Sequence, residues 1–323
     1  MKLHILINPA AAAGKTLQVF SRIEPVLEQG GHIYTVHYSS LTHGLDAIMK
    51  EILCDEVGIV NVLVLGGDGS MHDVINGITD FSRVRIGFLP CGSGNDAIRD
   101  MNLPKDPVQV LEIYLEGKIR RTMDIGEVVF YNTTDIVKST GLVIQDEQEV
   151  TRRFHVSAGI GFDADVCHGV AVSKAKKLFA KLHIAKLVYL YVALGVILRN
   201  NHFSLKVRTN EGAAKLPDVL FLVAMNHRYE GGGFCFCPEA ETDDGLLDLC
   251  VARNITIPSF VRVFIHAFHG NHVRYTNHIT MCRTKRVMIE TDKPLYVHLD
   301  GEVYCRSSKL ELRTGTYKME MLI

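Results

Sequence analysis

The sequence predicts two domains: an α/β domain with a parallel sheet and helices on both faces, and a mostly antiparallel β-sandwich domain. In the first third of the chain, short runs of Val, Ile and Leu alternate with helical patterns, as in parallel sheets that helices bury on both sides. After about Arg121, strand-like segments dominate, which is typical of antiparallel sandwiches. With 323 residues the chain is long enough for both domains.

The first domain is expected over residues 1–122, and residues 316–323 would complete it if the chain returned there. Its predicted elements alternate in type along the chain: strand Leu3–Ile7, helix Thr16–Gln29, strand His32–Tyr38, helix Leu45–Leu53, strand Val62–Leu65, helix Met71–Ile78 and strand Ile86–Leu89. Parallel sheets bind ligands at the carboxyl ends of their strands. Three unusual segments follow such ends and should share one sheet edge: Asn8–Ala12, Gly66–Ser70 and Pro90–Asp96.

The second domain is expected over residues 123–315 and consists mainly of short strands. They are Glu127–Tyr131, Phe154–Ser157, Phe203–Val207, Val219–Ala224, Leu246–Val251, Arg286–Ile289, Leu295–His298 and Lys309–Leu312. A helical stretch over Val172–Leu198 interrupts them and carries five lysines and no acidic residue. It could lie against anionic headgroups, or it could be a packed helix with a solvated basic face.

Composition excludes several classes of protein. The formal net charge is −1 and the pI is near 6.9, which argues against a nucleic-acid partner. The eight cysteines include no CxxC pair and are expected to be reduced thiols of a cytoplasmic protein. The longest apolar run, Leu187–Leu198, is shorter than the ~20 residues that span a bilayer.

The glycine-rich loops suggest phosphate chemistry. Gly66-Gly67-Asp68-Gly69-Ser70 follows a strand and opens a helix, so its amides can point at phosphate oxygens. A carboxylate among them makes sense if a divalent cation lies between, although Asp68 could also simply cap a tight turn. Gly92–Asp96, after the next predicted strand, is a second loop that combines glycines with a carboxylate. Lys15 could face a phosphate or be solvated, since Pro9 stands where a Walker A loop needs Gly.

Two acidic segments of the second domain each allow two interpretations. Asp300-Gly301 is a strong hairpin signal, and Glu302 after it could instead project into the interdomain cleft as a general base. The segment Asp243–Asp248 could be a turn or a cation site with oxygen ligands.

Taken together, these motifs resemble those of the diacylglycerol kinase catalytic family in its soluble bacterial form. The Asn-Pro, GGDGT, P-x-G-T-x-N-D, DG-x-L-D and DGE motifs of that family correspond, in order, to Asn8-Pro9, Gly66–Ser70, Pro90–Asp96, Asp244–Asp248 and Asp300–Glu302. The resemblance covers essentially the whole chain. Ser70 and Ser93 replace threonines and keep the hydroxyl, and Asp73 replaces Glu.

The resemblance also implies roles for particular residues. An ATP site would include Asn8, Pro9, Ala10, Ala11, Ala12, Lys15, Ser40, Gly66, Gly67, Asp68, Gly69, Ser70, Met71, His72, Asp73, Gly92, Ser93, Asn95 and Asp96. Asp68 would lie at the nucleotide-bound Mg²⁺, and Glu302 would take the proton from the acceptor hydroxyl. A structural Mg²⁺ would be held by Glu241, Asp244 and the carbonyl of Leu246, and Asp124 would lie near the cleft.

The implied activity is ATP-dependent phosphorylation of a lipid hydroxyl, with diacylglycerol as the expected acceptor and phosphatidic acid as the product. The enzyme would work at the inner face of the cell membrane by peripheral contact, and the family resemblance is compatible with a homodimer. Two alternatives stay open. One is a kinase with a soluble substrate, related to NAD kinases, and the other is a lipid- or nucleotide-binding regulator without catalysis.

Overall fold

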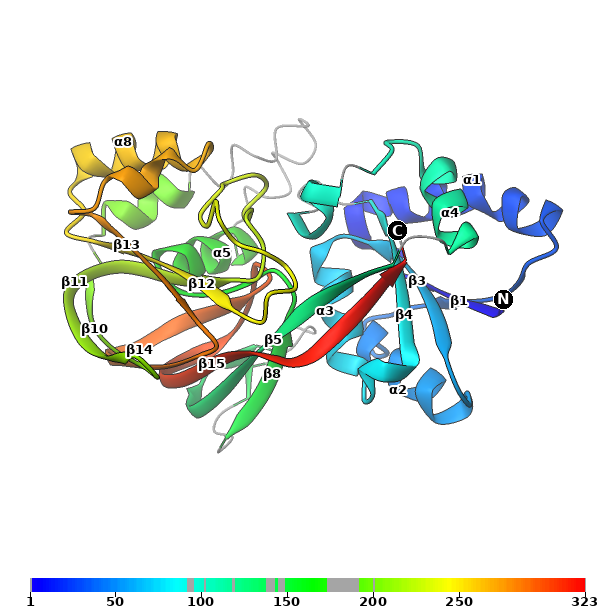
Figure 1. The fold of residues 1–323 in the computed structure, drawn as a ribbon, viewed down its shortest axis with the longest axis horizontal. Helices are drawn as coiled ribbons and strands as arrows, with labels where there is room; N and C mark the ends of the chain where they lie inside the picture. Colours follow the sequence, from blue (N-terminus) through cyan, green and yellow to red (C-terminus); the bar gives the residue numbers. More distant parts are fainter. Residues whose placement is uncertain are drawn as a thin grey trace.

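The structure is a computed structural model that describes residues 2–91, 96–101, 103–117, 120–137, 143–144, 149–172, 192–199 and 201–322. The predicted architecture is confirmed: an α/β domain is followed by a mostly antiparallel β-sandwich domain. Figure 1 shows the two lobes side by side, with two long strands, β5 and β15, running from one to the other.

The first domain is built on a parallel sheet of order β2-β1-β3-β4. Its strands are β1 (Lys2–Ile7), β2 (Ile33–Tyr38), β3 (Val60–Gly66) and β4 (Val84–Pro90), and its helices are α1 (Lys15–Gln29), α2 (Leu45–Asp55), α3 (Asp68–Gly77) and α4 (Pro107–Glu116). Figure 1 shows α1 and α4 on one face of the sheet and α2 and α3 on the other. The strands β1, β3 and β4 carry consecutive buried Val, Ile and Leu because helices cover both faces, whereas the edge strand β2 has no buried residue.

The second domain is a strongly curved antiparallel sheet that folds over its own core. Its strands are β5 (Arg120–Thr134), β8 (Val150–Phe154), β9 (Ser157–Gly161), β10 (Phe203–Thr209), β11 (Gly212–Met225), β12 (Leu247–Arg253), β13 (Ile279–Thr284), β14 (Arg286–Leu299) and β15 (Glu302–Leu322), while β6 (Ile136–Val137) and β7 (Val143–Ile144) form a separate two-stranded sheet. Of these, β9 pairs with both β11 and β14 and so joins strands that are not neighbours elsewhere. Inward-facing side chains such as Phe130, Leu222 and Val297 fill the interior.

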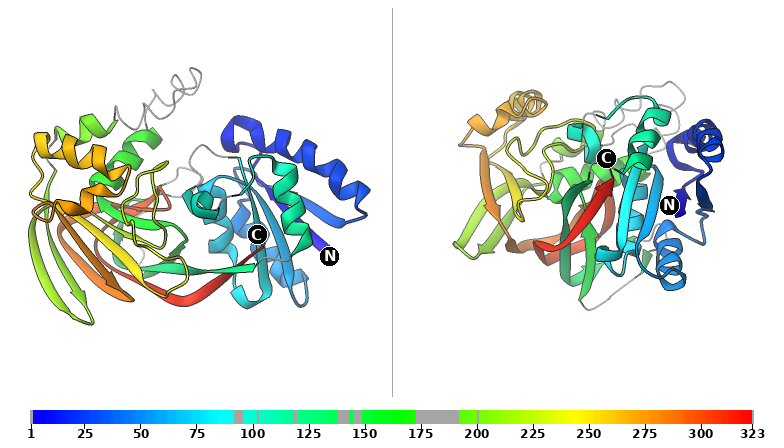
Figure 2. Two further views of the ribbon diagram at one scale, coloured as in Figure 1. Left: turned by 45° about the horizontal axis from the view of Figure 1, so that its top comes forward. Right: turned by 45° about the vertical axis from the view of Figure 1, so that its right-hand side comes forward.

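The strands β5 and β15 belong to both lobes. Their antiparallel ladder starts in the second domain and continues to the end of β15, where Glu320 and Met321 pair in parallel with Arg85 and Ile86 of β4. The two further views in Figure 2 show this ribbon entering the first lobe. Its register shifts between Arg313 and Tyr317, around Gly315, which has a φ of 82°. Met319 and Met321 are buried in the core of the first domain.

Helices cover one side of the second domain. These are α5 (Phe162–Val172), a helical segment over residues 192–197, and α8 (Ile257–Ala267). Of the helix predicted over Val172–Leu198, the structure describes only its first residue, where α5 ends, and residues 192–198, of which 192–197 are helical; its lysines lie outside the described residues. None of the helices among the described residues combines the length and apolar character that crossing a bilayer requires.

Candidate active site

The strand-end loops meet at one edge of the first sheet. Ile7 is aligned with Tyr38 and Leu65, and Gly66 with Pro90. The amide of Cys91 donates to the carbonyl of Gly66 at 2.7 Å, which ties the ends of β3 and β4 together. The three predicted segments therefore begin at a common edge, as predicted, and the segment after β2 begins there too. Of the residues expected there, Gly92, Ser93 and Asn95 lie outside the described residues.

The first of these loops is held by its own backbone and by Asn8. The side-chain oxygen of Asn8 accepts a hydrogen bond from the amide of Ala10 at 3.0 Å. The backbone carbonyl of Asn8 accepts from the hydroxyl of buried Thr16 at 2.9 Å. Lys15 is the first residue of α1 and is exposed. In the neighbouring loop, Ser40 accepts from the amide of His43 at 3.1 Å.

Helix α3 begins at Asp68, three residues before the predicted start at Met71. The amide of Ser70 donates to the carbonyl of Gly67, so the glycine-rich segment itself forms the first turn. A side chain at position 66 would lie 2.3 Å from the Ser70 side chain, so only glycine fits between β3 and the helix. The N–H groups of the first turn of α3 therefore lie at the sheet edge, as an anion site requires.

Asp68 is a partly buried residue whose carboxylate has one buried oxygen without a hydrogen-bond partner among the described residues. Its Oδ2 accepts from the amide of Asp96 at 3.2 Å, and its Oδ1 has no hydrogen-bond partner among the described residues. Burial raises the pKa of Asp68, and nearby Asp96 and Asp300 raise it further, while His155 opposes them. A buried oxygen without a partner, among carboxylates, fits a ligand atom for a divalent cation.

Asp96 connects this edge to the second domain. One of its oxygens accepts from the guanidinium of Arg99 at 3.1 and 3.2 Å, and the other accepts from the amide of Gly232 at 2.7 Å. The Gly231–Gly233 segment of the second domain therefore contacts Asp96, the first residue of the 3-10 helix Asp96–Met101.

Glu302 lies at the amino end of α3 although it belongs to the second domain. A Cβ placed on Gly69 would be 3.2 Å from the Glu302 Oε1 atom. Glu302 is exposed and follows a two-residue turn between β14 and β15, in which Asp300 and Gly301 have φ values of 52° and 82°. The predicted hairpin at Asp300-Gly301 is confirmed, and it places Glu302 beside Gly69 of α3, whereas the role of Glu302 as a general base stays a prediction.

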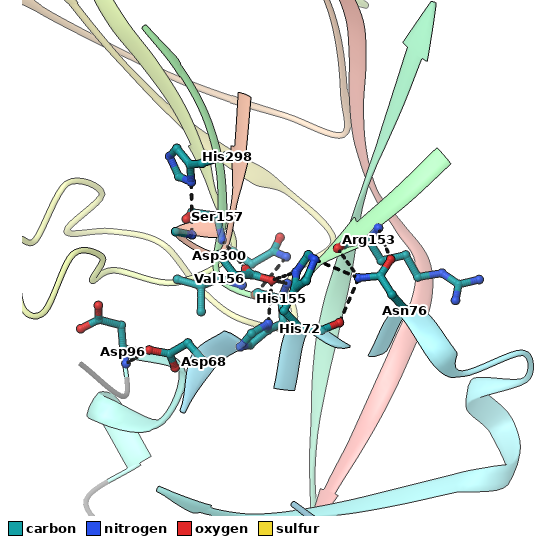
Figure 3. Close-up of polar contacts among 12 residues, drawn as sticks. Asp68, His72, Asn76, Asp96, Arg153, His155, Val156, Ser157, His298 and Asp300 are labelled. Carbon is teal, nitrogen blue, oxygen red and sulfur yellow. Dashed lines mark hydrogen bonds and ion pairs between the residues drawn. The ribbon is translucent and has the colours of Figure 1, made fainter. Parts of the chain in front are cut away.

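The side chain of Asp300 is completely buried and has several hydrogen-bond partners (Figure 3). Its Oδ1 accepts from the amides of Val156 and Ser157 at 2.8 and 3.2 Å, and its Oδ2 lies 2.9 Å from His155 Nδ1 and 2.8 Å from His72 Nδ1. Burial alone would raise the pKa of Asp300, but the charge and hydrogen bond of His155, with the hydrogen bond of His72, hold it well below its usual range.

The pKa of His155 is raised, whereas that of Asp300 is lowered. Burial would lower the pKa of His155, and the Asp300 carboxylate outweighs burial and raises it.

Asn76 and Arg153 join α3 to β8 directly. The Asn76 side chain accepts from the Arg153 amide and donates to the Arg153 carbonyl, both at 3.0 Å (Figure 3). The Arg153 guanidinium donates to the carbonyls of Ile75 and Ile78 at the end of α3 and stacks on Tyr317. The helix that carries Asp68 and Asp73 is therefore fixed to the second domain along its length. Burial raises the pKa of Asp73 to about 6, and nearby Asp46 and Glu302 add to this.

A second buried polar cluster, which the sequence did not indicate, contains Asp163, Glu230 and His298. His298 Nε2 lies 2.9 Å from Asp163 Oδ2 and 3.4 Å from Glu230 Oε1, and the Ser157 hydroxyl donates to Glu230 at 2.6 Å. Burial raises the pKa of Glu230 to about 7. The two carboxylates outweigh the effect of burial on His298 and raise its pKa to about 9.

Asp124 and the segment 241–246 lie together in the second domain. The Asp124 amide donates to the Thr242 carbonyl, and its Oδ2 accepts from the amide of Gly245 at 2.6 Å. The ammonium of Lys318 lies 3.4 Å from Asp124 Oδ1. Asp244 accepts from the amide of Leu246 at 2.9 Å, as in a tight turn. Glu241 lines a cavity of about 580 Å³ next to this segment, and the metal role of Glu241, Asp244 and Leu246 stays a prediction.

Comparison with known proteins gives the family. Residues 2–128 match the model of the diacylglycerol kinase catalytic domain, and residues 156–312 match the model of the YegS C-terminal NAD kinase beta sandwich-like domain. The chain therefore belongs to the diacylglycerol kinase catalytic-domain family, in the form that carries this second domain, and is a diacylglycerol- or lipid-kinase-like enzyme.

Individual relatives are distant but nearly full-length. A Bacillus subtilis (strain 168) protein provisionally named lipid kinase YtlR is 27% identical over 304 residues, covering 92% of each chain. A diacylglycerol kinase of the same organism is 22% identical and covers 93% of this chain and 89% of its own. A crystal structure of a diacylglycerol kinase from Bacillus anthracis str. Sterne superposes with a TM-score of 0.66 at 16% identity, covering 99% of this chain and 96% of that one. The last likeness concerns the fold alone.

Proposed function

We propose that the protein transfers the γ-phosphoryl group of ATP to a lipid hydroxyl and that diacylglycerol is the acceptor. The position of Glu302 carries this proposal. A carboxylate of the second domain faces the amino end of α3 at Gly69, next to the residues expected to hold a nucleotide. Phosphoryl transfer asks the protein mainly for positioning and for charge neutralisation, and a general base completes it.

The residues divide into two groups by what they can do. The first-domain group would bind and orient the triphosphate. It consists of the N–H groups in the first turn of α3 together with Asn8 and Ser40. The unused Oδ1 of Asp68 would hold a magnesium ion, which when bound neutralises charge on the phosphates. The second-domain group, headed by Glu302, would orient the acceptor and remove its proton.

The acceptor class rests on the family and on the names of the relatives, since no described side chain singles out one acyl chain or headgroup. Peripheral contact with a membrane follows from the proposal, because diacylglycerol resides in bilayers.

The test is a transfer assay with radiolabelled ATP and a panel of lipids in mixed micelles, followed by identification of the labelled product. The expected product is phosphatidic acid, formed only with magnesium present. Labelling of a water-soluble acceptor without any lipid product would overturn the acceptor assignment, and absence of labelling across the whole panel would overturn the kinase assignment.

A further inference from the structure

Helix α8 covers the second domain with one side and presents an unusual other side. A capping box formed by Thr256 and Ser259 starts the helix. Phe260, Val263 and Ala267 face inward and pack with residues of α5 in one apolar cluster. The remaining side of such a helix is normally polar, because it faces water.

Here part of the outer side is apolar. Ile257, Val261, Ile265 and Phe268 are 53%, 49%, 59% and 46% exposed. Their spacing of four, four and three residues places them in one stripe along the helix. Leu194 and Leu198, in and after the helical segment 192–197 of the same layer, are also exposed. Figure 1 shows α8 at the outer edge of the second lobe. A contiguous apolar surface of this kind marks a contact with something other than water.

Two arginines lie on or beside α8. The segment between Asp248 and Glu290 contains no acidic residue, and of its arginines Arg283 and Arg286 are paired with Asp248 and Glu311 on the neighbouring strands. Arg262 and Arg274 are exposed, and neither forms an ion pair with a carboxylate within the described part of the chain. Arg274 donates to His266 of α8 at 2.8 Å, so its charge lies beside the helix.

We propose that this surface, called here the α8 face and made of Ile257, Val261, Ile265, Phe268, Arg262 and Arg274, docks onto a bilayer that contains anionic lipids. The four apolar side chains enter the boundary between headgroups and acyl chains, and the two arginines lie among the lipid phosphates. The proposal rests on the proposed function in one respect: an enzyme that phosphorylates diacylglycerol has to take it from a bilayer.

A second copy of the chain fits this surface less well than a bilayer does. A symmetric contact through α8 would bring the cationic flanks of two copies together, and like charges repel. The helix has 11 residues and so is about 16 Å long. That is short for an interface, since specific dimers bury at least about 1,200 Å² in total.

Co-sedimentation of the full-length protein with sucrose-loaded vesicles tests the α8 face. We expect binding to phosphatidylcholine vesicles that contain phosphatidylglycerol, and weaker binding to phosphatidylcholine alone. The triple variant Ile257→Ser/Val261→Ser/Ile265→Ser should lose at least about tenfold in partition coefficient, because burial of one aliphatic side chain is worth on the order of tenfold. The double variant Leu41→Ser/Val57→Ser removes two exposed apolar side chains from the first domain and should bind as the wild type does.

Arg262→Glu is a second, independent variant, since its side chain makes no described contact that the fold needs. It should weaken binding to anionic vesicles by on the order of tenfold and make it less sensitive to salt. Equal binding of the wild type and the triple variant would overturn the proposal. So would a dimer in light scattering that the triple variant loses, since a second copy would then cover the face. Binding is measured without turnover, and all variants should phosphorylate lipid in micelles normally, so this result is separable from failure of the proposed function.

Discussion

Gly69 and Glu302 face each other across the two domains so closely that a methyl group on Gly69 would lie 3.2 Å from the carboxylate. This approach joins the first turn of α3 to the start of β15. A side chain added at Gly69 can therefore move the Glu302 carboxylate without weakening helix α3.

Gly69→Ala should therefore act on stability and turnover in opposite directions. Alanine favours a helix over glycine by roughly 0.5–1 kcal/mol, so the free energy of unfolding should not fall. The added methyl displaces Glu302, and we expect kcat to fall about tenfold. Gly195→Ala is the matched control, because it also lies in a helical segment but its Cβ would meet no atom within 4 Å. Unchanged kcat in Gly69→Ala would show that the carboxylate position is unimportant.

Glu302→Gln should leave nucleotide binding nearly intact and reduce turnover at least about a hundredfold, because the amide cannot accept the proton. Calorimetric titration with an ATP analogue and the radiolabel assay measure the two quantities. Glu211→Gln, in an exposed hairpin, serves as the control. Near-normal turnover of Glu302→Gln would refute the assigned role.

Asp300→Asn should destabilise the protein by about 3 kcal/mol at pH 7, because it leaves His155 and three amides without their carboxylate. The depressed pKa of Asp300 gives stability that is fully present above the unfolded value of about 3.9 and is lost as the pH falls toward the folded value. The raised pKa of His155 has the opposite sign, so its contribution is lost as the pH rises through the folded value.

Urea unfolding at several pH values measures both effects. The wild type should lose stability on acidification more steeply than Asp300→Asn. Asp292→Asn, in an exposed position, should change stability by less than about 0.5 kcal/mol. An equal loss of stability on acidification in the wild type and in Asp300→Asn would contradict this account of the Asp300 carboxylate.

Glu230→Gln should lower the pKa of His298 from about 9, since one of the two carboxylates that raise it is removed while burial continues to lower it. Ring chemical shifts of His298 across the pH range report this directly. The Gly301 amide lies 3.3 Å from His298 Nδ1, a contact that the protonated ring gives up because that nitrogen then carries its own hydrogen. Glu239→Gln, at an exposed residue whose charge does not act on His298, should leave the pKa of His298 unchanged, and the same result in Glu230→Gln would contradict the coupling.

The sequence predicted what depends on local pattern. Buried apolar runs located the parallel strands, and glycines marked the loops after them, because both features follow from short-range geometry. The Asp-Gly pair predicted the hairpin before Glu302 for the same reason.

It could not predict contacts between segments far apart in the chain. His72, His155 and Asp300 meet only because α3, the bend between β8 and β9 and the β14–β15 turn converge, and no local pattern encodes that convergence. Asp163, Glu230 and His298 come together in the same way. The full extent of β15, from Glu302 to Leu322, was also missed, because its burial pattern changes where it passes from one lobe to the other.

The shared ribbon of β5 and β15 has a mechanical consequence. Two lobes joined by a flexible linker can rotate freely, whereas here a hydrogen-bonded pair of strands resists bending along most of its length. The ladder is interrupted between Arg313 and Tyr317, at the left-handed Gly315. The ribbon is therefore less constrained at that interruption than along its regular stretches, while the contacts of His72 and Asn76 with Asp300 and Arg153 keep α3 beside Glu302.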